Sequence, residues 1–475
     1  MTFQNPGLSA RAAVNWVRRH APDHWHEPLA SLPCDDVAAD FAARYAGIPA
    51  NSHTRMEPVV CYRVDGRSMP VLLGLYGCAE RVRAWLPGLP RRADRAGVTA
   101  LVAAATPPVV VTDAPCRQRA YARVDLTRLP ALRATPRDAG PYVTMGAVMA
   151  GEPGAAQTSL SVHRMLVLGR DRLALWMVPG RSLRRMHEAA VLTGRRLPVS
   201  VNIGAPPSAV MASALSTSVL PAGMGKLDLA GAMAGAPVSV AAGVSQPVAV
   251  LAESEIVLEG YLDCSVADES LHGPPDVSLP EFLGYDGNAR ADLPVLTVTA
   301  VTTRRAPRFQ AVIGPGREQS VILGLAGALS VALTTDDPDW RLIANLHYSP
   351  AGGGMLLLVV AVRKNSAADD DRLGGIARRI FDWHAFVKLI VFTETDVDIT
   401  SAEDVLWAIT TRANLGTDCA TFTGFRPLGM DPSQGADWTA ARGAAGGSGR
   451  TYVDATIPYA LRDRVVRSYS AEERS

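Results

Sequence analysis

The segments Glu255–Leu262 (EIVLEGYL) and Leu293–Thr303 (LPVLTVTAVTT) decide the fold class of this chain. Both are rich in β-branched and other apolar residues, a composition that predicts buried strands. Similar short runs, each ended by glycine or proline, recur from about residue 121 to 303, as in Arg164–Gly169 (RMLVLG). Closely spaced short strands of this kind are typical of a β-sandwich or β-barrel. Short helices are expected between them, at 183–192 and 208–215.

The regions on either side of this β-rich region alternate helical and strand patterns. Residues 8–20 are amphipathic, and the apolar run at 69–77 predicts a buried strand. After residue 311 the same alternation returns, which indicates a second α/β domain. We therefore expect an α+β multidomain protein, with an N-terminal α/β domain at 1–120, a barrel domain at 121–310, a C-terminal α/β domain at 311–438, and a linker and C-terminal helix at 439–475.

Composition and charge exclude several classes of protein. The 475 residues include 47 basic and 46 acidic side chains, so nucleic acid or an anionic membrane surface is not the expected main partner. Six cysteines occur without a CxxC motif, which argues against a disulfide framework or a zinc site. The stretches 205–225 and 229–252 are uncharged but rich in small and polar residues, and we expect buried strands and turns there. With no signal-peptide pattern, a cytoplasmic enzyme is expected.

An acidic segment separates the two strands quoted above. Its charged residues are Asp263, Asp268, Glu269, Asp276, Glu281, Asp286, Asp292 and a single Arg290. One interpretation is a solvated loop. The other is that Asp276 and Glu281 lie together over a cleft, where an arginine holds one carboxylate ionised and its neighbour carries a proton. Arg164, beside His163 on a predicted strand, is a candidate for that arginine or for a structural salt bridge.

Taken in order, these segments resemble the UbiD family of carboxy-lyases, which use prenylated FMN. The resemblance runs from about residue 70 to 427 and is carried most specifically by EIVLEGY, LPVLTVTAVT and DVLWAITTR, with SVHRMLVLG and PDVSLPEFLGYDG between or before them. It implies an α/β N-terminal domain, a split β-barrel that binds the flavin, an α/β C-terminal domain and a C-terminal dimerising helix. This architecture agrees with the one expected from the residues alone.

The resemblance also implies a catalytic trio of one arginine and two acids. On the family pattern the arginine falls on Arg164, the first acid on Asp276 and the second on Glu281. The implied reaction is the reversible, non-oxidative decarboxylation of an α,β-unsaturated or (hetero)aromatic acid through a covalent adduct with prenylated FMN. Arg164 would orient the substrate carboxylate and pair with Asp276, and Glu281 would donate the proton. The sequence does not choose the substrate; secondary metabolism is one option.

The chain departs from the family at the flavin phosphate. The family commonly binds a divalent metal there, usually Mn²⁺, through Asn, His and Glu. Those positions fall here on Ser159, on Arg181 or Ser182, and on Lys226. A lysine in place of a ligating glutamate reverses the local charge, so we hypothesise that Lys226 and Arg181 neutralise the phosphate without a metal. The alternative is a shifted alignment in which Asp228 is the metal ligand.

The resemblance names further cofactor contacts and partners. Lys388 matches a lysine near the flavin phosphate, and His163 is either a flavin or substrate contact or a packed structural histidine. Expected partners are a small carboxylic acid, a flavin prenyltransferase that supplies the cofactor, and further copies of the chain in a homodimer or higher homo-oligomer. The alternatives are a non-catalytic flavin-binding accessory protein and an FMN redox enzyme. The remaining expected flavin-pocket residues are Thr144, Met145, Ser161 and Pro206.

Overall fold

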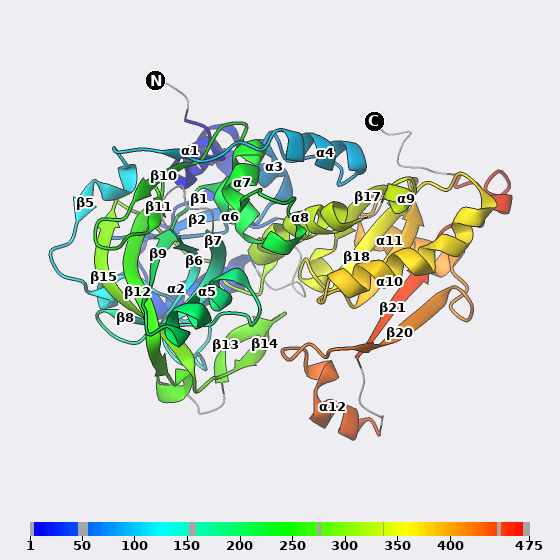
Figure 1. The fold of residues 1–475 in the computed structure, drawn as a ribbon. Coiled ribbons are helices and arrows are strands. Elements are labelled where there is room, and N and C mark those ends of the chain that lie inside the picture. Colours follow the sequence, from blue (N-terminus) through cyan, green and yellow to red (C-terminus); the bar gives the residue numbers. More distant parts are fainter. Residues whose placement is uncertain are drawn as a thin grey trace. The chain divides into compact units, whose positions relative to one another are not determined.

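The computed structural model describes residues 4–45, 56–151, 158–272, 277–335, 337–443 and 448–468. The chain divides into two compact units, the first made of residues 1–89 and 101–322 and the second of residues 90–100 and 323–475. Both units mix helices and strands, which confirms the α+β class (Figure 1). The predicted boundary between residues 120 and 121 lies inside the first unit, so the four-part division of the chain stays a prediction.

A closed, six-stranded antiparallel β-barrel is the largest sheet of the first unit. Its strands follow the order β12, β9, β6, β7, β8 and β15, and β15 pairs back with β12 to close it. This confirms the barrel expected from the sequence. The short strand β5 (Arg119–Ala120) extends β15. The barrel strands are β6 (Tyr142–Ala150), β7 (Ser159–Val167), β8 (Arg172–Leu175), β9 (Leu197–Ile203), β12 (Ile256–Ala267) and β15 (Leu293–Thr303).

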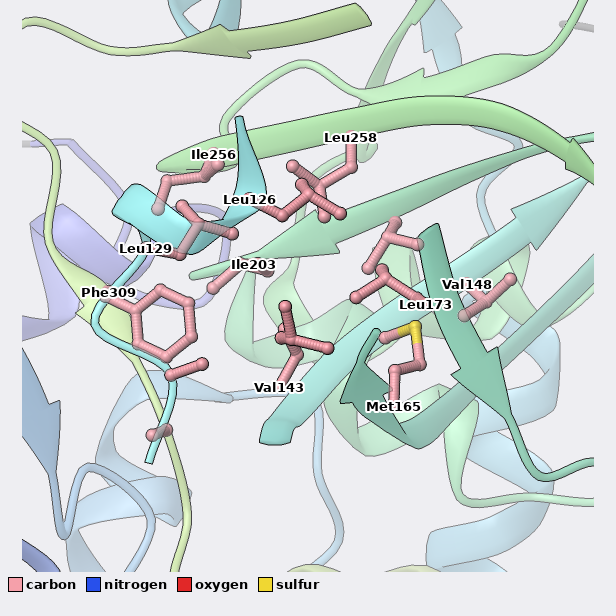
Figure 2. Close-up of a cluster of buried hydrophobic side chains, with 14 of the residues drawn as sticks. Leu126, Leu129, Val143, Val148, Met165, Leu173, Ile203, Ile256, Leu258 and Phe309 are labelled. Carbon is pink, nitrogen blue, oxygen red and sulfur yellow. The ribbon is translucent and has the colours of Figure 1, made fainter. Parts of the chain in front are cut away.

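Apolar side chains from neighbouring strands fill the barrel (Figure 2). Val143, Met165, Leu173, Ile203 and Leu258 are fully buried in one cluster. Because successive side chains of a strand point to opposite faces, the strand sequences place one set of apolar residues inside and another outside. On β7 the inner set includes Met165, and the next residue, Leu166, packs in a separate cluster with Tyr142 on the outer face.

An antiparallel hairpin supplies part of that outer cluster. It consists of β13 (Val277–Phe282) and β14 (Tyr285–Asn288), and Leu279 of β13 packs with Tyr142 and Leu166. The segment between β12 and this hairpin holds the short 3₁₀ helix η6 (Glu269–His272). The acidic segment is therefore structured rather than a simple solvated loop.

A four-stranded sheet lies elsewhere in the first unit. Its order is β1 (Trp25–His26), β2 (Val59–Tyr62), β3 (Val71–Leu73) and β16 (Phe309–Gln310), with β2 and β3 antiparallel and the outer pairs parallel. A three-stranded sheet joins β11 (Ala249–Leu251), β10 (Ser239–Ala242) and β4 (Val109–Val110). The helices are α1 (Ala10–His20), α2 (Cys34–Tyr45), α3 (Ala79–Trp85), α5 (Ser182–Leu192), α6 (Pro207–Ser213) and α7 (Lys226–Ala234).

The two uncharged stretches are only partly as expected. The helices predicted at 183–192 and 208–215 are confirmed by α5 and α6. The strands expected in the stretch 205–225 are wrong, because α6 and a 3₁₀ turn occupy it. The prediction of strands and turns at 229–252 is wrong for its first residues, which belong to α7. Small residues of α7, such as Ala230, Gly231 and Ala234, are buried on every face of the helix. The helix therefore has no amphipathic pattern that the sequence could reveal. Within the described ranges, no helix is both long and apolar enough to cross a membrane.

The second unit contains a five-stranded mixed sheet. Its order is β17 (Ile343–Tyr348), β18 (Leu357–Val362), β19 (Leu389–Glu394), β21 (Ser448–Asp454) and β20 (Cys419–Phe425), with the three inner strands parallel. The helices α9 (Asp337–Trp340), α10 (Leu373–Trp383), α11 (Ala402–Arg412) and α12 (Ala436–Ala441) belong to this unit, whereas α4 (Arg95–Ala103) and α8 (Arg317–Thr334) each cross from one unit to the other.

The C-terminal prediction needs correction. Residues 448–454, expected in a linker, form β21 because β19 and β20 both offer it strand partners. Beyond it, the described tail contains the 3₁₀ turn η10 (Tyr459–Leu461) and no α-helix up to residue 468. The expected C-terminal helix is therefore wrong for this part of the tail, and residues 469–475 lie outside the described residues.

Candidate active site

Arg164 brings two glutamates together on the outer face of the barrel. Its Nε and Nη2 donate to Oε1 of Glu281 at 2.9 and 2.7 Å. Its Nη1 donates to Oε1 of Glu269, and Nη2 lies 3.4 Å from Oε2 of the same residue. All three side chains are largely buried, with exposures of 13%, 12% and 0% for Arg164, Glu281 and Glu269. Burial alone would lower the pKa of Arg164, but Glu281 and then Glu269 outweigh it and raise that pKa.

Glu269 is the fixed member of this cluster. It begins η6, its backbone N–H donates to the carbonyl of Arg290 at 2.8 Å, and its Oε1 accepts from the Tyr142 hydroxyl at 2.9 Å. Tyr142 is fully buried, and burial followed by the charge of Glu269 raises its pKa, so the hydroxyl keeps its proton and donates. Tyr142 and Arg164 therefore hold the Glu269 carboxylate from two sides.

Glu281 is the less constrained member. It sits on β13, and both bonds from Arg164 reach its Oε1, so the arginine leaves Oε2 to other partners. Gly287 on the facing strand β14 lies against it, since a Cβ there would be 2.7 Å from Cγ of Glu281. Glu281 is thus positioned by a two-stranded hairpin at the edge of the site rather than by the barrel wall.

The charges of the cluster suit proton transfer. Two carboxylates and one guanidinium leave one negative charge in a largely buried site, and one proton brings the cluster to neutrality. A carboxyl group that carries such a proton, beside an arginine that can hold an anion, is the device required of a general acid.

The structure tests the predicted trio in part. It brings Arg164 and Glu281 into contact, while Asp276 lies outside the described residues. Glu269 was noted in the acidic segment but not as a site residue. Nothing in the local pattern separates it from Asp263 or Asp268, because its contact with Arg164 spans 105 residues and depends on how the barrel closes.

A serine and a histidine occupy the other face of β7. Oγ of Ser161 is 2.7 Å from Nε2 of His163, and Nδ1 of His163 is 2.8 Å from the carbonyl of Trp176. Burial lowers the pKa of His163 to about 4, with Lys226 lowering it further against the opposing effect of the Trp176 carbonyl. The ring is therefore neutral at pH 7. A carbonyl can only accept, so Nδ1 carries the proton and Nε2 accepts from Ser161.

Among the residues that the structure describes, Lys226 bonds two carbonyls and no carboxylate. It is the first residue of α7, and its Nζ donates to the carbonyls of Leu160 and Ser213 at 2.8 and 2.9 Å. Burial, and then the charge of Arg181, lower the pKa of Lys226 to about 7. An ammonium group has three hydrogens, so one donor remains for a further acceptor. Lys226 bonds the carbonyl of Leu160 on β7, and Arg164 lies four residues further along the same strand. That separation is about 13 Å at the usual rise of a strand.

The residues predicted at the family's metal-ligand positions do not fit a divalent cation. Ser159 is buried at the start of β7, Arg181 is exposed before α5, and the Ser182 hydroxyl lies 3.3 Å from that of Thr217. Together with Lys226 they offer hydroxyls and cations, whereas Mn²⁺ requires carboxylate, carbonyl or imidazole donors. Among the described residues no three His, Cys, Asp or Glu side chains gather in a way that could hold a metal.

The other predicted contacts are dispersed. Thr144 accepts a bond from the backbone N–H of Val312 at 3.0 Å, Met145 is buried in β6, and Pro206 precedes α6. Lys388 belongs to the second unit, where its Nζ is 2.6 Å from the buried Asp431. The flavin roles of these residues stay predictions.

Two family models match the chain. The 3-octaprenyl-4-hydroxybenzoate carboxy-lyase Rift-related domain matches residues 109–318, and the C-terminal domain of the same carboxy-lyase, UbiD_C, matches residues 324–455. The gallate decarboxylase of Lactiplantibacillus plantarum is 29% identical over 337 residues, which cover 70% of this chain and 69% of that protein.

Solved structures are similar over almost the whole chain. The apo 3,4-dihydroxybenzoic acid decarboxylase of Enterobacter cloacae has a TM-score of 0.88 and 31% identity, covering 97% of this chain and 96% of the other. The UbiD-class enzyme HmfF of Pelotomaculum thermopropionicum, solved with FMN, has a TM-score of 0.81 and 26% identity over 97% of each chain. An evolved dimeric form of HmfF, solved with prFMN, has a TM-score of 0.77 and 25% identity, again over 97% of each chain.

Proposed function

Because the chain belongs to the UbiD family of carboxy-lyases, we propose that it decarboxylates an aromatic carboxylic acid with prenylated FMN as cofactor and Glu281 as proton donor. The observation that carries this assignment is the contact of Arg164 with two buried glutamates, of which one is fixed and the other lies at the edge of the site. A non-catalytic flavin-binding accessory protein would have no need for such a cluster, since burying its charges is costly.

The two glutamates take different roles in this proposal. A substrate carboxylate that binds Arg164 must displace one of them. Glu269 is held by Tyr142 as well as by Arg164, so Glu281 is the carboxyl group that can leave. Once displaced it is free of its ion pair, and a proton on it becomes available to the carbon that loses CO₂. Arg164 thus couples substrate binding to release of the acid. Asp276 would assist as a second partner of Arg164.

We expect the cofactor phosphate to bind near the start of the same strand. Prenylated FMN, when bound, supplies the electron sink for loss of CO₂. Lys226 has an unused donor and no carboxylate partner within the described part of the chain. It and the neighbouring Arg181 would hold the phosphate group directly. Ser161, His163, Thr144, Met145, Ser159, Ser182 and Pro206 would line the pocket, and Lys388 would be a further phosphate contact. This arrangement needs no divalent metal.

Hydroxylated benzoic acids are the substrates to test first. Gallate and 3,4-dihydroxybenzoate are the acids named for two of the similar proteins. A hydroxyl ortho or para to the carboxylate also donates electron density to the ring carbon that bears it, which makes that carbon easier to protonate as CO₂ leaves. We include cinnamic-type acids as the comparison class, because the resemblance allows unsaturated acids as well.

The proposal is tested by preparing the protein with and without a co-expressed flavin prenyltransferase. Bound flavin is identified by mass spectrometry, and CO₂ release is measured with each acid. We expect release only from the co-expressed preparation. Glu281→Gln should lower kcat by about 10²- to 10⁴-fold with flavin content unchanged. Glu188→Gln, an exposed glutamate on α5, is the matched control.

Three outcomes would count against parts of this assignment. Prenylated flavin bound without CO₂ release from any acid would favour the accessory protein. Full activity in Glu281→Gln would remove the proton-donor role. Stoichiometric Mn²⁺ in an elemental analysis of the active protein would remove the metal-free phosphate site.

A further inference from the structure

Four arginines converge on a surface cleft that is separate from the site described above. The cleft has a volume of about 330 Å³ and is lined by Arg18, Arg63, Arg67 and Arg308. Among the described residues that line it, Glu27 is the one acidic side chain. Four guanidinium groups against one carboxylate leave three positive charges in this cleft, on a chain whose total formal charge is +1.

The topology of the four-stranded sheet builds this concentration of charge. β1 and β2 run parallel, and β3 and β16 run opposite to them. The carboxyl ends of the first pair therefore meet the amino ends of the second pair at one edge of the sheet. Glu27 and Arg63 directly follow β1 and β2, and Arg308 directly precedes β16. Separate strand ends thus bring these residues together from distant parts of the sequence.

The existing partners do not neutralise the arginines. Arg18 and Arg63 share Glu27, each at 3.8 Å, which is long for a salt bridge. Arg67 donates to the carbonyl of Thr127 at 2.6 Å, and a carbonyl carries no net charge. The backbone N–H of Arg308, not its side chain, bonds Glu255 at 3.1 Å. Mutual repulsion among these groups is a cost that a bound anion would remove.

The wall beside the arginines is partly apolar. The guanidinium carbon of Arg18 lies 5.0 Å from the ring centroid of Trp25, a cation–π distance that holds this arginine at the cleft. Cys61, Val64 and Pro70 complete the apolar surface. A ligand could therefore place an anionic group on the arginines and a carbon skeleton against the wall.

We propose that this cleft is a binding site for the phosphate group of a small molecule. A carboxylate is planar and takes one arginine fork, whereas a phosphate dianion is tetrahedral and accepts bonds from arginines arriving from several directions. The arginines here come from the end of a helix, a turn and two strand ends. The site is independent of the proposed decarboxylase activity, because it shares no residue with it.

Calorimetric titration of the full chain tests the proposal, with Lys226→Met as background so that the flavin phosphate site does not contribute. The probes are inorganic phosphate, glycerol 3-phosphate and succinate at constant ionic strength. We expect saturable binding of one phosphate or phosphate ester, with Kd about tenfold higher or more in Arg63→Gln and Arg308→Gln. Arg172→Gln, an exposed arginine on β8, is the matched control and should leave Kd unchanged.

The melting temperature of Arg63→Gln, measured with and without phosphate, distinguishes a binding role of this arginine from a structural one. Arg63 is 59% exposed, so its replacement should not harm folding. Without phosphate, Arg63→Gln should melt no lower than its parent, because repulsion is relieved; with phosphate it should lose the parent's upward shift. Tighter binding of glycerol 3-phosphate than of inorganic phosphate indicates an ester site, and equal binding a site for free phosphate. No saturable binding, equal binding of succinate, or equal weakening by Arg172→Gln would overturn the proposal.

Discussion

At Lys226, we expect a single side chain to link flavin binding to pH. Its pKa, lowered to about 7 by burial and Arg181, means that the ammonium is charged below that pH and increasingly neutral above it. A phosphate monoester loses its second proton near pH 6. Affinity for FMN should therefore be greatest between about pH 6 and 7 and fall by up to tenfold per pH unit above this range.

Two substitutions separate charge from shape in that prediction. Lys226→Arg keeps the charge at all these pH values, so the dependence above pH 7 should disappear while binding persists. Lys226→Met should weaken binding throughout and flatten the profile as well. Quenching of FMN fluorescence between pH 6 and 9 measures both. A wild-type profile unchanged in Lys226→Met would show that the phosphate binds elsewhere.

Glu269 should matter as much as Glu281 although it does not reach the edge of the site. In Glu269→Gln the remaining pair, Arg164 and Glu281, is neutral without an added proton. Arg164 then holds Glu281 without competition from Glu269, so a substrate carboxylate displaces Glu281 less readily. We expect kcat to fall by about 10²-fold or more with flavin content unchanged. Activity within twofold of Glu188→Gln would contradict the shared-charge argument.

The hairpin β13–β14 is the element on which Glu281 depends. A Cβ at Gly287 would lie 2.5 Å from Oγ of Ser278 and 2.7 Å from both Cγ of Glu281 and the carbonyl oxygen of Leu279. A backbone carbonyl cannot move aside as a side chain can, so Gly287→Ala should displace the hairpin. We expect a lower kcat with flavin binding retained. The control is Gly169→Ala, where a Cβ meets nothing within 4 Å.

A buried pair of acids connects α8 with the segment that follows β3. Glu57 and Glu318 are 1% and 2% exposed, and Glu318 accepts from the backbone N–H groups of Gly74 and Tyr76 at 3.0 and 2.9 Å. Burial, followed by the charge of Glu318, raises the pKa of Glu57 to about 8. The folded protein therefore keeps a proton that the unfolded chain releases above about pH 4.5.

Stability should consequently fall as pH rises from about 4.5 to 8, because the unfolded state binds fewer protons over this interval. Each such proton contributes up to about 1.4 kcal/mol per pH unit. Glu57→Gln is neutral at every pH and should lose much of this decline. Urea midpoints at pH 6 and pH 8.5 measure the effect. An equal decline in wild type and variant would assign it to other groups.

Elements with a local signature were predictable from the sequence, and those without one were not. α1 and α10 carry amphipathic patterns, and the barrel strands carry runs of β-branched residues ended by glycine or proline. α7 lacks a polar face, so its sequence does not show the alternation of polar and apolar residues that marks an amphipathic helix. Residues 448–454 begin in a glycine-rich stretch, and pairing with β19 and β20 makes them a strand. Glu269 could not be recognised for the same reason, because its role depends on a long-range contact with Arg164 of β7.

At the scale of the whole molecule, the charge balance conceals local imbalance. A formal charge of +1 rules out a generally basic protein, yet one cleft gathers four arginines and the candidate active site carries an excess of carboxylate. The net charge of this chain therefore does not indicate its function. It depends on which charges the topology brings together, as with the strand ends around Arg63 and the closure of the barrel around Arg164.

The second unit offers the surface on which self-association is expected. α11 and the chain beside it expose Leu406, Leu415 and Val466 at 59%, 62% and 73%. The tail is fastened there, since Nη2 of Arg467 bonds Asp404 of α11 at 2.6 Å. Apolar side chains exposed on an anchored surface favour burial against another copy of the chain. We predict that a dimer or larger assembly of the 50.3 kDa chain uses this surface.

Light scattering coupled to gel filtration measures this directly. Leu406→Asp or Val466→Asp should shift the mass toward that of one chain, because a carboxylate in an apolar interface is costly to desolvate. Leu192→Asp on α5, where the leucine is 87% exposed, is the matched control and should leave the mass unchanged. Dissociation by Leu192→Asp alone would move the interface to the first unit. Because Arg164, Glu269 and Glu281 all belong to that first unit, a monomeric Leu406→Asp variant should still bind flavin, and loss of flavin on dissociation would mean that the assembly completes the cofactor site.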